Sequence, residues 1–115
     1  MKKATLLSPL EAGVCSLLAP VPTVPHGIVS RAVITTSTLR ITWFHFAAGQ
    51  ELAEHTSKSR ALVQILVGTC EFSVGGTLHT LKPGDLLHLP PGAPHAVRAP
   101  EAFAMLLTQV SEASD

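Results

Sequence analysis

The stretch from Gly84 to His95, GDLLHLPPGAPH, constrains the fold most, because it sets a short apolar segment between two kinds of chain-turning residues. Residues 84–85 suit a tight turn, residues 86–89 are long enough for one buried strand, and residues 90–92 force a sharp bend. The bend fixes the direction in which His95 leaves the backbone. This stretch therefore predicts short strands joined by rigid turns, with His95 aimed at a particular place.

Short segments of this kind recur along the chain from residue 29 onward, and helical periodicity is absent. Each segment is rich in β-branched, aromatic or other apolar residues and ends at a turn of Gly, Pro, Ser or Thr. The predicted strands are Val29–Thr36, Leu39–Phe46, Glu51–His55, Ala61–Val67, Cys70–Val74, Thr77–Leu81, Leu86–Leu89, Ala96–Arg98 and Ala102–Val110. Many short strands at this spacing predict an all-β jelly-roll barrel.

The chain of 115 residues is long enough for one domain with its own core, and we expect three parts. Residues 1–29 are rich in proline and predict an extended arm, with one short strand at 13–18, that packs on the barrel or on a partner. Residues 30–110 form the barrel, and residues 111–115 a disordered tail. An apolar arm beside an exposed sheet favours a homodimer, which a monomer in light scattering at high micromolar concentration would contradict.

Composition excludes some partners. Eight Lys and Arg balance eight Asp and Glu, so no basic surface for nucleic acid is expected, and no apolar run is long enough to cross a membrane. Pro9 and Glu11 interrupt the first apolar run before it reaches the length of a signal peptide, so we expect a cytoplasmic protein. Cys15 and Cys70 lie far apart in sequence and are expected to be free thiols, Cys70 packing in the core.

Polar residues inside apolar strands are the candidates for a site. Gln64 is the single strongly polar residue between Ala61 and Gly68, so we expect it to be buried in a central strand with a hydrogen-bonding partner. Strand alternation places Phe44 and Phe46 on one face, with Trp43 and His45 on the other. The histidines outside positions 55 and 95 are expected to be structural or at the surface, with the direction of His45 and His88 open: His26, His45, His79 and His88.

The turn-strand-turn stretch resembles the second motif of the cupin superfamily, small jelly-roll barrels that often hold one metal ion. That motif spaces Gly, Pro, Gly, His and Asn at fixed offsets. Four of the five positions match here and Ala99 replaces the asparagine; the matching residues are Gly84, Pro90, Gly92 and His95. The resemblance covers residues from about 30 to 110 and implies a small RmlC-like cupin barrel with His95 pointing inward.

The first cupin motif is degenerate. Gly49, His55 and Gly68 match it, but Ser57 stands at the second histidine, and the glutamate position falls on Ala61 or Leu62. Of the four ligands that the family implies, two histidines remain. Zn, Fe, Mn and Ni sites generally use three or four protein ligands, so we expect an incomplete site helped by the Gln64 amide, with no metal as the alternative.

The resemblance implies a pocket that binds a small molecule, a divalent metal ion, or both. The expected pocket residues are His55, His95, Gln64, Ser57, Phe44, Phe46 and Phe72, of which His55, His95 and Gln64 are the expected metal ligands. One alternative is a metal-free isomerase or epimerase with an imidazole as general base, and another is a ligand-sensing module without catalysis. Whether the protein is an enzyme stays open, although the absence of tyrosine excludes a phenolic acid.

Overall fold

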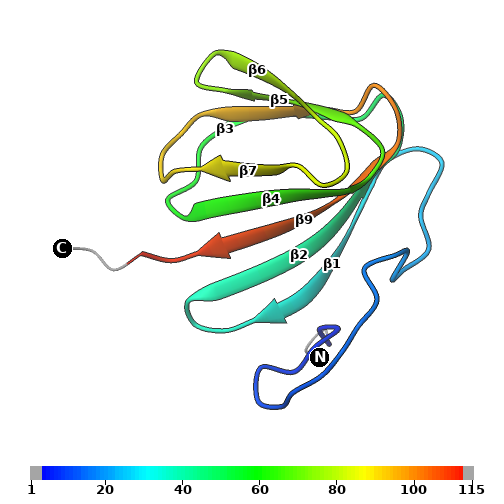
Figure 1. Cartoon of the computed structure of the whole chain (residues 1–115), viewed down its shortest axis with the longest axis vertical. Coiled ribbons are helices and arrows are strands. Elements are labelled where there is room, and N and C mark those ends of the chain that lie inside the picture. Colours follow the sequence, from blue (N-terminus) through cyan, green and yellow to red (C-terminus); the bar gives the residue numbers. More distant parts are fainter. Residues whose placement is uncertain (1–3, 113–115) are drawn as a thin grey trace.

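Two antiparallel sheets face each other in the computed structural model, which describes residues 4–112 (Figure 1). The described chain has nine strands and no helix, so no helix that could cross a membrane occurs in it. The strands are β1 (Ile28–Thr35), β2 (Leu39–Phe46), β3 (Glu51–His55), β4 (Arg60–Val67), β5 (Cys70–Val74), β6 (Thr77–Leu81), β7 (Leu86–Leu89), β8 (His95–Arg98) and β9 (Phe103–Val110). Their order is β1-β2-β9-β4-β7 in one sheet and β3-β8-β5-β6 in the other.

The prediction of an all-β jelly-roll barrel is confirmed, and the predicted strands agree with the observed ones within one residue at each end. The agreement follows from local turn chemistry. Gly75 and Gly76, for example, both have positive φ in the turn between β5 and β6, a backbone conformation that glycine adopts without strain. The short strand expected at residues 13–18 is wrong, because the described chain has no strand before β1.

The core lies between the two sheets, where alternate residues of each strand point inward. Phe46 of β2 stacks on Phe103 of β9 with ring centroids 4.7 Å apart, and Phe72 of β5 meets them from the opposite sheet in the same cluster of buried side chains. Each of these three rings is at most 1% exposed. Burial of large apolar side chains of this kind is the main favourable contribution to folding.

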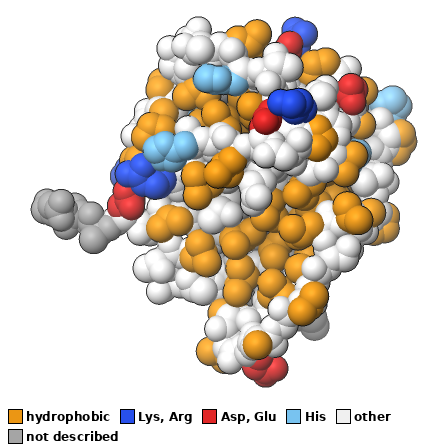
Figure 2. All heavy atoms as spheres, in the orientation of Figure 1, with side chains coloured by type: hydrophobic (Ala, Val, Ile, Leu, Met, Phe, Trp, Pro, Cys, Tyr) orange, Lys and Arg blue, Asp and Glu red, His pale blue; other side chains and the backbone are white. Residues whose placement is uncertain are grey.

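The arm lies on the outer face of the five-stranded sheet. Trp43 of β2 points outward, is 1% exposed and donates its indole N–H to the Leu17 carbonyl at 3.0 Å. The backbone N–H of Leu7 donates to Val33 of β1 at 2.7 Å. Figure 2 shows hydrophobic side chains gathered along the arm and beside β1 and β2. The arm thus covers apolar residues that would otherwise face water.

The ends of the barrel differ slightly from the expected boundaries. β1 begins at Ile28, two residues before the expected start of the barrel. In the expected tail, the N–H of Ser111 donates to Thr38, and Glu112 forms an ion pair with Arg60. The remainder of the expected tail, residues 113–115, lies outside the described residues.

Candidate functional site

A β-bulge brings the two motif histidines together. In the ladder between β3 and β8, Leu52 pairs with Val97, but the next pair is His55 with His95, so two residues of β3 oppose one of β8. The extra residue reverses the alternation of β3 after the bulge, so His55 shares the face of His95 instead of pointing away from it. The rings meet edge to face with centroids 4.2 Å apart. His95 is 9% exposed, whereas His55 lies at the exposed rim.

Both imidazoles are held by the same local hydrogen bond. His55 Nδ1 lies 2.9 Å from the Ala53 carbonyl oxygen, and His95 Nδ1 lies 3.0 Å from the Ala93 carbonyl oxygen. A carbonyl oxygen only accepts, so Nδ1 carries the proton in each neutral ring. The Nε2 lone pair of each ring therefore remains available to a ligand or to a proton donor. Neither Nε2 atom has a hydrogen-bond partner among the described residues.

The histidine cavity, a space of about 290 Å³ inside one end of the barrel, is where the two rings meet. It is lined by His55, Ser57, Ser59, Ala61, Leu89, Pro90, Ala93, His95, Leu107 and Gln109. Three of these belong to the expected pocket, namely both histidines and Ser57. Gln109 and Ser59 were not expected. The alternation of β9 was the signal for Gln109, because an inward Phe103 predicts inward residues at 105, 107 and 109.

The second motif also positions the loop between β3 and β4. Residues 90–93 form a tight turn in which the N–H of Ala93 donates to the Pro90 carbonyl at 3.2 Å. Gly92, at a φ of +82°, donates its N–H to the Ser57 carbonyl at 2.8 Å. This bond ties the loop that carries Ser57 to the turn that precedes His95. Ser57 Oγ in turn accepts from the N–H of Ser59 at 3.2 Å.

The expected role of Gln64 is corrected by its position. Gln64 is exposed on the outer face of β4, because its neighbours Val63 and Ile65 fill the core from the inner face. A nearly continuous apolar run suggested burial on both faces, but the arm covers the outer face only in part, and Leu66 belongs to the covered part. Gln64 therefore does not line the histidine cavity. The amide that does so is that of Gln109, on the neighbouring strand β9.

The three phenylalanines also lie elsewhere. Phe46 and Phe72 are sealed in the core, and Phe44 is partly buried against it. None of them is part of the cavity wall, whose apolar portion comes mainly from Leu89 and Leu107. The alternation of β2 is as expected, since Phe44 and Phe46 pack inward while Trp43 belongs to the outer cluster. Inward direction alone did not decide which residues reach the cavity.

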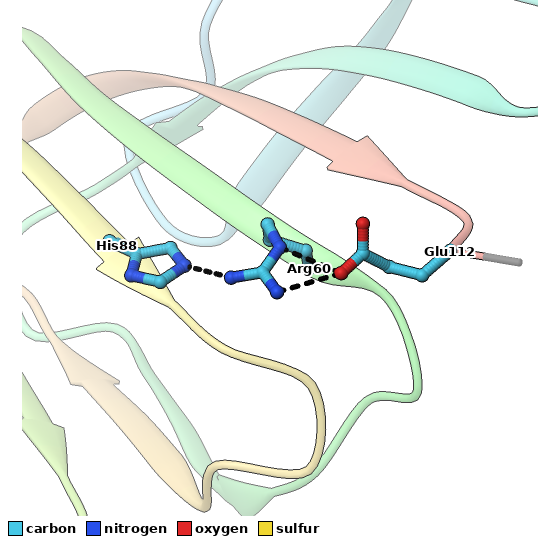
Figure 3. Close-up of polar contacts among 3 residues, drawn as sticks. All are labelled: Arg60, His88 and Glu112. Atoms are coloured by element: carbon cyan, nitrogen blue, oxygen red, sulfur yellow. Dashed lines mark hydrogen bonds and ion pairs between the residues drawn. The ribbon is translucent and has the colours of Figure 1, made fainter. Parts of the chain in front are cut away.

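Two other histidines lie on the outer face of the barrel. His45 stacks on Trp43 with ring centroids 6.3 Å apart. His88 of β7 is exposed, and its Nε2 accepts a hydrogen bond of 2.7 Å from Arg60 Nη1 (Figure 3). Arg60 also donates to Glu112 through Nε and Nη2. The arginine thus links β4, β7 and the chain after β9 outside the cavity.

The donor atoms of the cavity decide which metal ions fit. The wall offers two imidazole nitrogens, one amide oxygen and two hydroxyls, and contains no carboxylate. Among residues 4–112, no group of three or more His, Cys, Asp or Glu side chains is arranged to hold an ion. These donors do not fit the two-histidine, one-carboxylate set of iron oxygenases. They fit an ion that prefers nitrogen, such as Ni²⁺ or Zn²⁺, better than Mn²⁺ or Fe²⁺.

Two facing antiparallel sheets around an internal cavity, with two histidines inside its open end, define a single-domain jelly-roll barrel of the double-stranded β-helix type. The sequence model of the cupin domain matches residues 42–110, and the chain belongs to the cupin family. The resemblance noted in the two motifs is therefore confirmed.

Solved structures share this fold. A conserved protein of unknown function from Streptococcus pyogenes is 31% identical, with a TM-score of 0.82 over 97% of this chain and 98% of that one. A cupin superfamily protein from Desulfitobacterium hafniense is 23% identical, with a TM-score of 0.80 over 89% and 94%. A cupin 2 conserved barrel domain protein from Leptotrichia buccalis is 34% identical, with a TM-score of 0.75 over 79% and 44%. The comparison with curated proteins found no match.

Proposed function

We propose that the histidine cavity binds one divalent transition-metal ion through Nε2 of His55 and of His95, and that a small molecule completes its coordination. The observation that supports this most is the matched pair of Nδ1 hydrogen bonds, because it leaves the metal-binding nitrogen of both rings free in one cavity. Gln109 is the third donor in this proposal, in place of Gln64. We expect Ni²⁺ and Zn²⁺ to bind more tightly than Mn²⁺ or Fe²⁺.

In this proposal the side chains divide the work. The carbonyls of Ala53 and Ala93 hold the rings in place, the hydroxyls of Ser57 and Ser59 offer hydrogen bonds to the small molecule, and Leu89 and Leu107 limit water on the inner side. A bound ion of this kind supplies Lewis acidity to a ligand in an open position. A cavity of about 290 Å³ lies near the lower end of the range for ligand sites, which favours a ligand of few atoms.

The test is metal titration of untagged protein after dialysis against a chelator. Calorimetry with Ni²⁺ and Zn²⁺ is expected to give about one equivalent per chain, and His55→Ala and His95→Ala are each expected to weaken binding by at least about tenfold. His26→Ala, at an exposed position in the arm, is the matched control and is expected to bind normally. Full binding by His55→Ala would contradict the proposal. So would retention of less than about 0.2 equivalents of either metal by the wild type after loading and desalting.

A second pair of variants tests the third donor. Gln109→Ala is expected to weaken metal binding, whereas Gln64→Ala on the outer face of the adjacent strand is expected to have no effect. Equal behaviour of the two variants would remove Gln109 from the site.

The metal-free alternative has one observation in its favour, which is that the cavity wall contains no carboxylate. In that case the two free Nε2 atoms accept hydrogen bonds or a proton from a small molecule, as in an isomerase, an epimerase or a sensing module. Absence of metal binding together with ligand binding that requires His95 would favour it.

A further inference from the structure

The histidine cavity adjoins a second, polar space at the same end of the barrel, here called the rim cleft. The rim cleft has a volume of about 160 Å³. It is lined by Thr36, Ser37, Thr38, Leu39, Arg40, Ser59, Gln109 and Ser111. Ser59 and Gln109 line both spaces, so the two spaces adjoin at the opening of the barrel. Any molecule that contacts Ser59 and Gln109 from the histidine cavity therefore lies beside the rim cleft.

Strand register places Arg40 at this opening. Arg40 of β2 pairs directly with Gln109 of β9, and Gln109 pairs on its other side with Ala61 of β4. Directly paired residues of antiparallel strands project from the same face of the sheet. Gln109 and Ala61 both line the histidine cavity, so Arg40 belongs to the same inward-facing row, one strand further out.

Arg40 brings the one permanent charge to the opening. Apart from the two imidazoles, no other residue in the wall of either space is ionisable. Arg40 forms no ion pair with any carboxylate among residues 4–112, in contrast to Arg60, which is bound to Glu112. A guanidinium is always protonated and presents donors in a fork that matches a carboxylate or a phosphate.

Hydroxyl-bearing residues line the rim cleft together with Arg40, and hydrogen bonds already hold the turn that carries several of them. Thr36 Oγ1 accepts the N–H groups of Thr38 and Leu39 at 3.2 and 3.0 Å, and the N–H of Ser111 donates to the Thr38 carbonyl at 2.9 Å. The hydroxyl protons of the cleft remain available as donors, since no hydrogen bond from them occurs among the described residues. Ordered donors around one cation suit a small anionic group, because little side-chain freedom is lost on binding.

We propose that Arg40 and the hydroxyls of the rim cleft form an anion-binding subsite, and that the small molecule bound in the histidine cavity carries a carboxylate or phosphate group that this subsite holds. The first half of the proposal stands on the rim cleft alone. The second half rests on the proposed function, because it requires that the ligand also occupy the histidine cavity.

The experiment is NMR titration of ¹⁵N-labelled, metal-free protein at constant ionic strength with three probes. Malonate tests a carboxylate, inorganic phosphate tests a phosphate, and malonamide is the neutral counterpart of malonate. We expect at least one anion to shift the amide signals of Thr38, Ser59 and Gln109, and malonamide to leave them unchanged. Arg40→Gln is expected to weaken binding of that anion by at least about tenfold, and Arg40→Lys is expected to restore part of it.

Lys58→Gln is the matched control, because Lys58 is an exposed cation in the loop between Ser57 and Ser59 but lines neither space. It is expected to change anion affinity by less than about twofold, since an exposed charge that does not contact the anion is screened by salt. Equal binding of malonate and malonamide, unchanged affinity in Arg40→Gln, an equal loss in Lys58→Gln, or no shift with either anion would overturn the subsite.

The metal site and the anion subsite are tested by separate outcomes. Arg40→Gln is expected to keep full metal binding, and His55→Ala is expected to keep binding of the anion. A wild-type protein that binds the anion but no metal would count against the metal proposal alone.

Discussion

His55 and His95 are direct partners across the ladder between β3 and β8, and their ring centroids lie 4.2 Å apart. The partnership depends on the bulge in β3, because uninterrupted pairing from Leu52 and Val97 would set Glu54 opposite His95. An acidic side chain would then face the cavity in place of an imidazole. The bulge therefore determines the chemistry of the site.

The Nδ1 hydrogen bonds of this pair predict the tautomers of both rings. At a pH where the rings are neutral, ¹⁵N NMR of the side chains is expected to find the proton on Nδ1 in both His55 and His95. Binding of Zn²⁺ is then expected to shift the Nε2 signals of these two residues and not that of the exposed His26. A proton on Nε2 of either ring in the metal-free protein would contradict the tautomer assignment.

Gly68 packs against the backbone before β9, so we expect a single added methyl group at this position to destabilise the fold strongly. It has a φ of +74°, and a Cβ at this position would collide with the Ala102 carbonyl oxygen and lie 3.0 Å from Phe103 Cα. Gly68→Ala is expected to lower the free energy of unfolding by about 3 kcal/mol or more, since positive φ and steric overlap both contribute. Urea denaturation measures this change.

Gly76→Ala is the control for backbone strain, because Gly76 has a φ of +86° but no atom within 4 Å of the added Cβ. It is expected to cost about 1 kcal/mol. Equal losses in the two variants would mean that the contact with Ala102 is not decisive.

Cys70 and Cys15 are both free, and their surroundings predict different reactivity. Burial raises the pKa of the Cys70 thiol from 9.0 to about 12, and the neighbouring Glu71 carboxylate adds to the rise. In iodoacetamide labelling at pH 8, followed by mass spectrometry, Cys15 is expected to react in the folded protein and Cys70 only after unfolding. Labelling of both at the same rate would contradict the burial of Cys70.

The raised pKa of Cys70 also predicts a pH dependence of stability. The folded state holds the thiol proton more tightly than the unfolded chain. The protonated thiol therefore contributes fully to the free energy of unfolding below pH 9.0, and this contribution is lost as the pH rises toward about 12. Cys70→Ala is expected to lose less stability than the wild type over that range, while Cys15→Ala follows the wild type. An identical alkaline loss in Cys70→Ala would assign the effect to another group.

Asp85 is expected to make the stability of the fold depend on pH in the acidic range. Its carboxylate accepts the Lys82 backbone N–H at 2.9 Å, which lowers the pKa of the Asp85 carboxyl, and the Lys82 ammonium adds to this effect. A lowered pKa stabilises the fold above the pKa of the unfolded chain, and the benefit is lost as the pH falls through the folded value. The stability difference between wild type and Asp85→Asn is therefore expected to shrink below about pH 4. Glu101→Gln, at an exposed carboxyl, is the control, and a difference that stays constant with pH would be contrary to this expectation.

The strands were predictable because their limits are set locally. Gly, Pro and short polar turns end each strand, and the spacing of Gly84, Pro90 and Gly92 sets the turn from which His95 enters the wall of the histidine cavity. His55 followed from its motif position. Strand alternation alone would have pointed it away from His95.

The sequence by itself determined the jelly-roll barrel, the nine strands of residues 4–112 and the two motif histidines, because turn chemistry and alternating apolar residues are encoded within a few positions of each other. The tertiary structure alone decided which residues share the cavity. Gln109 and Arg40 come together by register between β2 and β9, whereas Gln64 faces outward because Val63 and Ile65 fill the core. Which residues lie side by side in this way depends on the pairing of strands distant in sequence, which no local pattern specifies.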